Sequence, residues 1–130
     1  MGPARPRAVV LDAGALVAFE RNDRRVRRLI ELAADHGASL HVPAGVIAQV
    51  WRDGARQARL SRLVSSGLLD VRNLDLEEAR AAGSLCGITG TADVVDASVA
   101  LLARRHEAVV ATSDPDDLRR LDADLPLIRC

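Results

Sequence analysis

The chain has 130 residues, 48% of them hydrophobic, which is enough for one domain with a core of its own. Its 18 basic residues equal its 18 acidic residues, so the net charge provides no general attraction to nucleic acid. Every basic residue is Arg, which excludes a P-loop and Schiff-base chemistry, because both need a Lys.

Other classes of protein are excluded by what the sequence lacks. No apolar run approaches the roughly 20 residues that span a membrane, and the apolar run near the start is too short for a signal peptide. Cys86 and Cys130 are too scattered for a zinc or disulfide framework. We therefore expect a soluble, cytoplasmic protein with a single domain at 1–130, in which residues 1–7 form a flexible N-terminal arm.

The predicted elements alternate between strands and helices. The first is a Val-rich strand at 8–11, whose unbroken apolar run is typical of a strand buried on both faces. A short helix at 15–20 follows, and then a helix that Asn22 or Asp23 caps and Gly37 ends. The remaining strands are predicted at 40–42, 68–72, 108–111 and 125–128, and the remaining helices at 44–52, 55–65, 76–86, 94–106 and 114–121, with a loop at 87–91. This alternation predicts an α/β fold with a parallel sheet, and a proline in the last strand marks it as an edge.

Acidic residues recur where these elements meet. Asp12 directly follows the first strand, and Asp114 comes shortly after the fourth. Asp93 and Asp96 open the helix at 94–106, three residues apart and so on one face. If the first and fourth strands are neighbours, Asp12 and Asp114 meet at the switch point of the sheet, where open α/β sheets bind ligands. The start of the helix could approach the same edge or lie at the opposite end.

Each acid also has a purely structural interpretation. Asp12 could start a turn, Asp93 could cap its helix with Asp96 in the favoured first turn, and the last helix could be capped by Asp114. If the acids do cluster, they repel, and without a cation at least one of them should hold a proton. A hard divalent ion such as Mg²⁺ or Mn²⁺ removes that conflict and supports phosphodiester hydrolysis without any Lys, Cys or His.

Four segments of the chain resemble the PIN-domain family, and within it the VapC-type toxins of bacterial toxin–antitoxin pairs. Residues 9–16 resemble the opening strand with its first acid, and residues 42–50 resemble the segment that carries the second. Residues 92–97 resemble the third acidic segment, in which Asp96 is the closest match, and residues 111–118 resemble the closing Thr-x-Asp motif. The resemblance covers nearly the whole chain.

The resemblance implies a three-layer α/β/α fold with a central, mostly parallel sheet of about five strands. It implies an endoribonuclease that needs Mg²⁺ or Mn²⁺, is silenced by a VapB-type antitoxin and is often a homodimer. The residues expected to bind the metal and catalyse hydrolysis are Asp12, Asp96 and Asp114, with Asp93 as a further metal ligand. The residues expected to assist them are Gln49, Thr112 and Asp117.

Gln49 departs from the family pattern, which usually has Glu at this position. An amide is neutral and a poorer metal ligand, although it can hydrogen-bond a water on the metal. Two interpretations stay open: hydrolysis with weaker metal binding, in which Asp93 is a substitute carboxylate, or a weakened module that binds RNA or an antitoxin without efficient cleavage. Thr112 could hold a water or the scissile phosphate, or could simply bond the backbone of a turn. A DNA-directed nuclease with the same site is a third possibility.

Trp51, Arg52 and Arg56 are the expected contacts with RNA or with the antitoxin. Trp51 could stack on a base or pack at an interface. Arg52 and Arg56 begin a stripe on a predicted helix that continues to Arg62. Such a stripe could bind RNA phosphates, pair with an acidic segment of the antitoxin, or be an ordinary solvated face.

Overall fold

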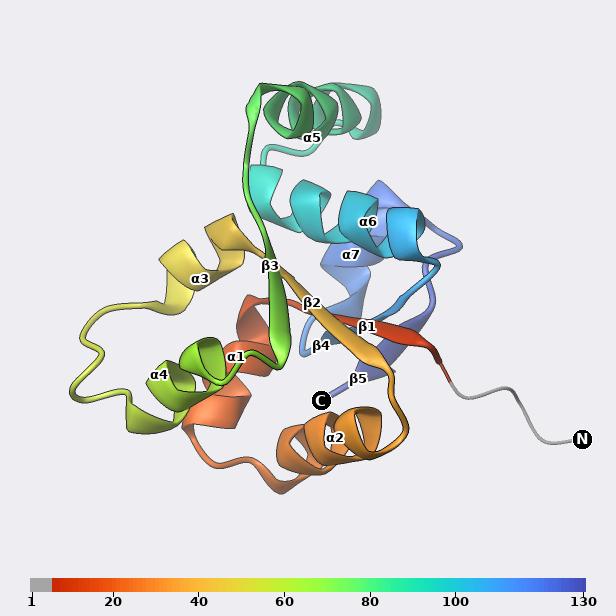
Figure 1. Cartoon of the computed structure of the whole chain (residues 1–130). Coiled ribbons are helices and arrows are strands. Elements are labelled where there is room, and N and C mark those ends of the chain that lie inside the picture. The colour runs from red at the N-terminus through yellow and green to blue at the C-terminus, as the bar shows by residue number, and fades with distance from the viewer. Residues whose placement is uncertain (1–5) are drawn as a thin grey trace, which may run out of the picture.

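A five-stranded parallel sheet forms the centre of the molecule in the computed structural model, which describes residues 6–130 (Figure 1). The strands are β1 (Ala8–Leu11), β2 (Ser39–Pro43), β3 (Leu69–Arg72), β4 (Val109–Thr112) and β5 (Leu127–Arg129). They lie in the order β3-β2-β1-β4-β5, and each neighbouring pair is parallel. The predicted parallel sheet and the pairing of the first strand with the fourth are confirmed.

Helices cover both faces of the sheet (Figure 1). They are α1 (Ala13–Glu20), α2 (Arg24–Asp35), α3 (Ala44–Val50), α4 (Ala58–Ser65), α5 (Leu76–Thr89), α6 (Val94–His106) and α7 (Pro115–Leu121). On one face α6 packs on β1, β2 and β4, and α5 and α7 lie beside it. On the other face α1 and α2 pack against the sheet, while α3 contacts both α1 and α6. This is the three-layer architecture that the resemblance to the PIN-domain family implies.

β1 lies in the middle of the sheet and is buried on both faces, as its apolar sequence predicts. Its four residues are at most 5% exposed, and it pairs with β2 on one side and β4 on the other. Asp12, which follows β1, is therefore placed at the middle of one edge of the sheet. β5 is an edge strand, as the proline before it indicates.

Most of the expected arm at 1–7 cannot be compared with the structure, because residues 1–5 lie outside the described residues. Arg7, at its end, is tied to β2. The carbonyl oxygen of Arg7 accepts hydrogen bonds from the amide of Ser39 at 2.9 Å and from its hydroxyl at 3.3 Å.

Two helix boundaries differ from the prediction. α5 continues through the expected loop at 87–91 as far as Thr89, whose hydroxyl donates to a backbone carbonyl of its own helix at 2.8 Å. It ends at Gly90, whose φ of 72° is readily adopted by a residue without Cβ. The residues 51–57, predicted to be largely helical, form a loop. The side chain of Gln57 bonds three backbone groups there and competes with the helical pattern.

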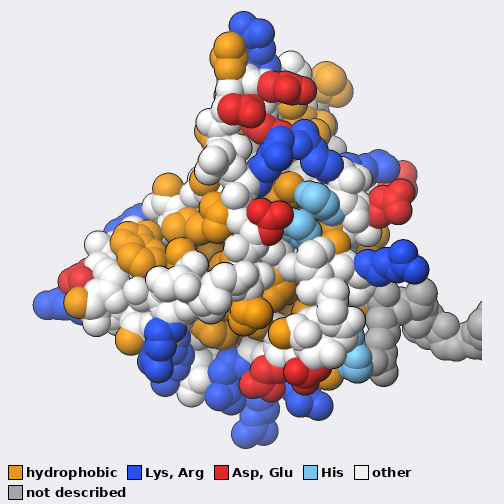
Figure 2. Space-filling model, in the orientation of Figure 1, with side chains coloured by type: hydrophobic (Ala, Val, Ile, Leu, Met, Phe, Trp, Pro, Cys, Tyr) orange, Lys and Arg blue, Asp and Glu red, His pale blue; other side chains and the backbone are white. Residues whose placement is uncertain are grey.

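No membrane-spanning helix is found within residues 6–130, and basic and acidic side chains are mixed on the face shown in Figure 2. No single helix within residues 6–130 is long and apolar enough to cross a membrane; α5 and α6 pass this test only as a pair, bent by 105°. Figure 2 shows Arg side chains both in the upper middle of one face and around its margin, with several along the lower margin beside acidic side chains. On that face, surface charge alone does not mark a nucleic-acid site.

Candidate active site

The carboxyl ends of β1 and β4 form the switch point of the sheet, because the strand order runs from β1 to β3 on one side and from β4 to β5 on the other. Asp12 follows β1, Thr112 is the last residue of β4, and Asp114 is two residues farther. α6 leads into the start of β4, so its N-terminus reaches the carboxyl edge (Figure 1). The charge of Asp12 accordingly acts on Asp96. The structure thus decides between the two placements of this helix that the sequence leaves open.

Asp12 is a nearly buried carboxylate, 7% exposed, at the N-cap of α1. One of its oxygens accepts a hydrogen bond from the amide of Ala15 at 2.9 Å. Burial raises the pKa of Asp12 and so does the charge of Asp114, whereas hydrogen bonds from Thr112 and Ala15 lower it. Asp12 therefore has a capping role, but a cap alone requires neither such burial nor a second carboxylate beside it.

Thr112 links two of the acids. Its fully buried hydroxyl accepts a hydrogen bond from the amide of Asp114 at 2.9 Å and makes a side-chain hydrogen bond with Asp12. The turn-bonding interpretation of Thr112 is therefore correct, and the same bond fixes the backbone of Asp114 relative to Asp12. Asp114 stands at the N-cap position of α7, but its side chain makes no capping hydrogen bond.

Asp93 and Asp96 bring two further carboxylates from the first turn of α6. Asp93 is its N-cap, since one oxygen accepts from the amides of Val95 at 3.1 Å and of Asp96 at 3.0 Å. The pKa of Asp96 is raised to about 7, first by burial, then by the charge of Asp93 and a hydrogen bond with it, and further by Asp12 and Asp117. Near neutral pH, the charge of Asp96 is therefore costly unless a proton or a cation compensates it.

Asp117 joins these residues from the first turn of α7. A hydrogen bond with Asp114, and the charge of Asp114, raise the pKa of Asp117, while Arg120 lowers it. Two carboxyl groups can hydrogen-bond each other only if one of them holds a proton. Asp117 is thus more than a solvated acid of the first helical turn. We call these five residues the acid cluster: Asp12, Asp93, Asp96, Asp114 and Asp117.

The acid cluster fits a hard cation by the chemistry of its donors. Carboxylate oxygens are the ligands that Mg²⁺ and Mn²⁺ prefer, and a positive charge would relieve the repulsion that raises these pKa values. Within residues 6–130, no three His, Cys, Asp or Glu side chains already stand as ligands of one ion. The carboxylates would therefore have to move closer together to hold one.

Gln49 and Trp51 lie away from these contacts, on and just after α3. Gln49 is exposed in the last turn of α3, and within the described residues no hydrogen bond joins it to the acid cluster. Trp51 is 36% exposed, and its ring lies against the backbone of Gly54, where an added Cβ would come within 2.8 Å of it. Trp51 is thus held in place while part of its surface stays open.

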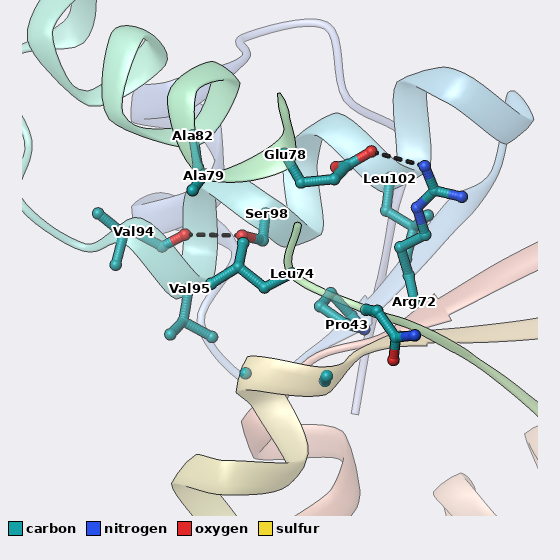
Figure 3. Close-up of a pocket in the computed structure, with 13 residues that line it drawn as sticks. Pro43, Arg72, Leu74, Glu78, Ala79, Ala82, Val94, Val95, Ser98 and Leu102 are labelled. Carbon is teal, nitrogen blue, oxygen red and sulfur yellow. Dashed lines mark hydrogen bonds and ion pairs between the residues drawn. The ribbon is translucent and has the colours of Figure 1, made fainter. Parts of the chain in front are cut away.

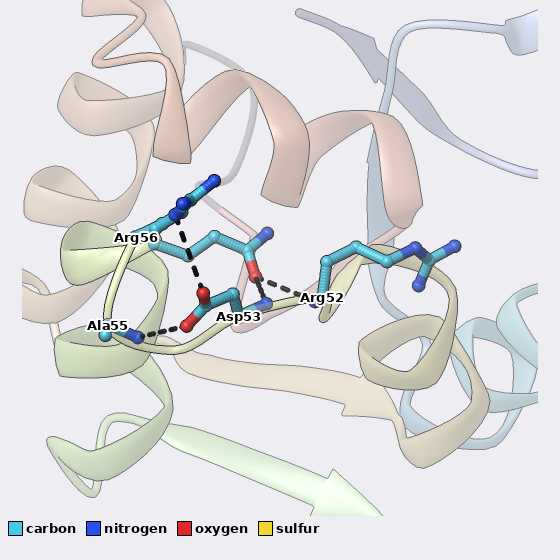
Figure 4. A network of polar contacts seen from close by, with 5 residues as sticks. Arg52, Asp53, Ala55 and Arg56 are labelled. Carbon is cyan, nitrogen blue, oxygen red and sulfur yellow. Dashed lines mark hydrogen bonds and ion pairs between the residues drawn. The ribbon is translucent and has the colours of Figure 1, made fainter.

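The loop at 51–57 holds two of the expected Arg contacts (Figure 4). The side-chain oxygen of Gln57 accepts from the amides of Arg52 at 2.8 Å and Asp53 at 3.0 Å. The guanidinium of Arg52 turns back onto two backbone carbonyls near the end of α3, and Arg56 lies 3.7 Å from the carboxylate of Asp53. The predicted helical stripe is therefore wrong for Arg52 and Arg56, which lie in a loop that side-chain contacts order.

The structure also brings three unpredicted residues to the acid cluster. Gly14, in the first turn of α1, lies so close to Ser113 that an added Cβ would stand 2.0 Å from the hydroxyl oxygen of Ser113. Arg120 lies 3.6 Å from Asp117, one turn along α7. The spacing of three between Asp117 and Arg120 is visible in the sequence and could have indicated this contact. The Gly14–Ser113 contact joins segments far apart in the chain and left no local signal.

A separate apolar pocket of about 160 Å³ lies between β3, α5 and α6 (Figure 3). The one carboxylate that lines it, Glu78, is paired with Arg72 at 2.9 Å and with Arg105 at 2.7 Å. None of the acid cluster lines this pocket. The switch point is therefore the better candidate for catalysis.

Known proteins share this arrangement, in which acidic residues that follow β1 and β4 lie with those at the start of α6 at one edge of a parallel sheet. The PIN domain model matches residues 9–124. The chain belongs to the PIN domain family. The matched segment includes all five members of the acid cluster, and it confirms the resemblance seen in the sequence. No curated protein sequence matches the chain.

Solved structures of toxin–antitoxin proteins share the fold of this PIN domain. VapBC2 from Rickettsia felis, bound to a DNA fragment from its promoter, has 17% identity and a TM-score of 0.72, over 95% of this chain and 98% of that one. VapC20 from Mycobacterium tuberculosis, a toxin that cleaves the sarcin–ricin loop, has 16% identity and a TM-score of 0.71, over 94% and 99%. VapBC-1 from nontypeable Haemophilus influenzae has 15% identity and a TM-score of 0.64, over 94% and 97%.

Proposed function

We propose that this PIN domain is an endoribonuclease that depends on Mg²⁺ or Mn²⁺ and acts as the toxin of a type II toxin–antitoxin pair. The observation that carries the proposal is the acid cluster, in which burial and mutual charge raise the pKa of Asp12, Asp96 and Asp117. Folding places these groups together at a cost that a cation would offset. The similarity to VapC20, which cleaves RNA in the sarcin–ricin loop, supports RNA as the substrate.

The roles of the residues follow from their contacts. Asp12, Asp96 and Asp114 would hold the ion, which supplies charge stabilisation at the phosphate oxygens and activation of water when it is bound. The hydroxyl of Thr112 orients Asp12 and fixes the backbone of Asp114. The hydrogen bond between Asp117 and Asp114, which raises the pKa of Asp117, would hold the Asp114 side chain in position beside the ion.

Asp93 and Gln49 bear on the two interpretations that the sequence leaves open, hydrolysis with weaker metal binding or a module that binds without efficient cleavage. Asp93 uses one carboxylate oxygen for its cap, and its side chain lies within hydrogen-bond reach of Asp96, one of the proposed ligands. We propose that it substitutes for the Glu that the family usually carries at position 49. The second candidate function, a module that binds RNA or an antitoxin without efficient cleavage, is favoured by one observation. Gln49 is neutral, and it is exposed on α3 without a hydrogen bond to the acid cluster among the described residues.

The proposed partner is a VapB-type antitoxin. Two of the similar structures, from R. felis and H. influenzae, are VapBC proteins, and the first of them is bound to promoter DNA. We propose that this chain likewise pairs with an antitoxin in the cytoplasm, and that it forms a homodimer. Trp51, Arg52 and Arg56 remain the proposed contact residues for RNA or the antitoxin, because all three are exposed in an ordered loop.

The test is cleavage of a structured RNA with Mn²⁺, with Mg²⁺ and with EDTA. Asp12→Asn keeps a side-chain oxygen that can cap α1 but loses the charge, so it should fold normally and lose cleavage. The matched control is Asp75→Asn, which makes the same change at the N-cap of α5, away from the acid cluster. Cleavage that survives EDTA, or that Asp12→Asn leaves intact, would refute the metal-dependent reaction. RNA binding without any cleavage would favour the second function.

A further inference from the structure

A polar groove of about 470 Å³ runs from the acid cluster along α7 and the junction of α5 with α6. Three members of the acid cluster line it, Asp93, Asp96 and Asp117, together with Thr89, Thr91 and Arg120. The groove therefore begins at three members of the acid cluster and continues to Thr89, Thr91 and Arg120, side chains that the proposed reaction does not use.

Arg120 is the cationic residue among those that line the groove. Its side chain is 70% exposed, and its guanidinium lies 3.6 Å from the carboxylate of Asp117, three residues earlier on the same helix. An exposed ion pair of this kind contributes little, so Arg120 can turn from Asp117 to a stronger ligand. A guanidinium matches the geometry of phosphate better than an ammonium does.

An RNA strand that crosses the acid cluster must carry its next phosphates past the same carboxylates. Those phosphates are repelled by the ionised members of the acid cluster, and the ion proposed at the site would compensate only the phosphate that is cut. Arg120 lines the groove beside Asp117, where its positive charge would offset this repulsion for a neighbouring phosphate. The other exposed Arg of α7, Arg119, is not part of the groove wall.

Two hydroxyl groups in the lining of the groove, those of Thr89 and Thr91, could distinguish RNA from DNA. Thr89 donates its single proton to the carbonyl of Leu85 at 2.8 Å, and its oxygen lies 3.3 Å from that of Thr91. Because the proton of Thr89 is engaged, Thr91 is the donor in the contact between them. The oxygen of Thr91 then remains an acceptor, and the 2′-hydroxyl of a ribose is a donor that DNA lacks.

We propose that this groove binds the RNA strand beside the cut, with Arg120 on a phosphate and Thr91 on a ribose 2′-hydroxyl. The inference rests on the proposed ribonuclease function and adds to it a binding site for the flanking nucleotide. Both residues act by positioning the strand and touch no reacting atom.

The phosphate contact is tested by RNA binding in a protein that does not cut. We would measure the affinity of Asp12→Asn for a single-stranded RNA across a range of salt concentrations, alone and combined with Arg120→Ala or Arg119→Ala. Loss of one phosphate contact should make the slope of the logarithm of the binding constant against the logarithm of the salt concentration less negative by about 0.7. It should also weaken binding several-fold at low salt. Only Arg120→Ala should do this, and Arg120→Lys should restore the slope because it keeps the charge.

Equal effects of Arg120→Ala and Arg119→Ala on the slope would overturn the phosphate contact while leaving the ribonuclease intact. A parent chain that neither binds nor cleaves RNA would remove the proposed function as well. The sugar contact is tested by Thr91→Val, which has a similar volume and no acceptor. It should weaken binding of RNA but not of DNA with the same sequence, and an equal loss for both would overturn that contact.

Discussion

Replacement of Gly14 even by Ala should reduce stability and activity, because Gly14 sets the distance between the two segments that carry Asp12 and Asp114. A Cβ at Gly14 would stand 2.0 Å from the hydroxyl oxygen of Ser113, 3.0 Å from its Cβ and 3.4 Å from the carboxylate of Asp12. Rotation of the Ser113 side chain can move the hydroxyl away. It cannot move the Cβ, so the backbone of the β4–α7 junction must also shift.

The expected change in the free energy of unfolding follows from two opposing effects. Overpacking of this kind costs about 1–3 kcal/mol, whereas Gly→Ala in a helix gains about 0.5–1 kcal/mol. We expect Gly14→Ala to destabilise the fold by about 1–2 kcal/mol, which for a chain of this size is a fall in Tm of roughly 3–10 °C. Activity should fall further, by about 100-fold, because a misplacement of roughly 1 Å between catalytic groups has that effect.

Thermal unfolding and RNA cleavage are the assays, with three companion variants. Gly83→Ala is the matched control, since a Cβ at Gly83, on α5, meets nothing within 4 Å, and it should raise the Tm slightly. Ser113→Ala should rescue Gly14→Ala partly, because it removes only the hydroxyl, and Ser113→Gly should rescue it more fully. If Gly14→Ala is as stable and active as Gly83→Ala, or if the Ser113 variants rescue nothing, the reasoning about this contact is refuted.

Four further predictions concern charges and caps. Gln49→Glu should strengthen Mn²⁺ binding and raise cleavage at low Mn²⁺, measured as the Mn²⁺ concentration for half-maximal rate; an unchanged rate curve would show that position 49 is not a ligand. The pKa of Asp96, about 7, lies above its value in an unfolded chain, so its contribution to stability is complete below about pH 4 and is lost as the pH rises through 7. In EDTA, the Tm of the natural chain should therefore fall between pH 5 and 8 relative to the Tm of Asp96→Asn. Parallel profiles of Tm against pH for the two proteins would contradict this. Asp23→Ala should cost about 1 kcal/mol in urea unfolding and Asp23→Asn much less, because Asp23 caps α2 through the amides of Arg25 and Val26, and equal costs would argue against the cap. Burial, with the charge of Asp12, raises the pKa of the Cys130 thiol to about 11, so iodoacetamide should react with it slowly at pH 8, and rapid alkylation would contradict that environment.

The strands could be predicted well because short-range patterns determine them. The apolar run of β1 and the Val-rich run of β4 locate two buried strands, and the acids that follow them locate the functional edge. The bounds of α6, predicted at 94–106, agree with the structure, since Asp93 is a strong N-cap signal. The end of α5 was missed because Gly87 suggests a helix end, whereas Gly90 provides it.

Contacts between distant segments could not be read from the sequence. The loop at 51–57 depends on the side chain of Gln57, which bonds the backbone of Val50 and Arg52. The spacing of the arginines does not indicate these hydrogen bonds. The approach of Gly14 to Ser113 and the shared hydrogen bond of Asp114 with Asp117 depend in the same way on how β1 and β4 bring their loops together. Such contacts belong to the tertiary structure.

Binding of Mn²⁺ tests most directly whether the acid cluster shares one cation. Calorimetric titration at pH 7.5 should show saturable Mn²⁺ binding to the natural chain, and Mn²⁺ at 100 times its Kd should stabilise the fold by about 2.7 kcal/mol. Asp12→Asn and Asp96→Asn should each abolish or severely weaken both effects, and Asp75→Asn should preserve them. Absence of binding by the natural chain, or equal binding by all four proteins, would contradict the account.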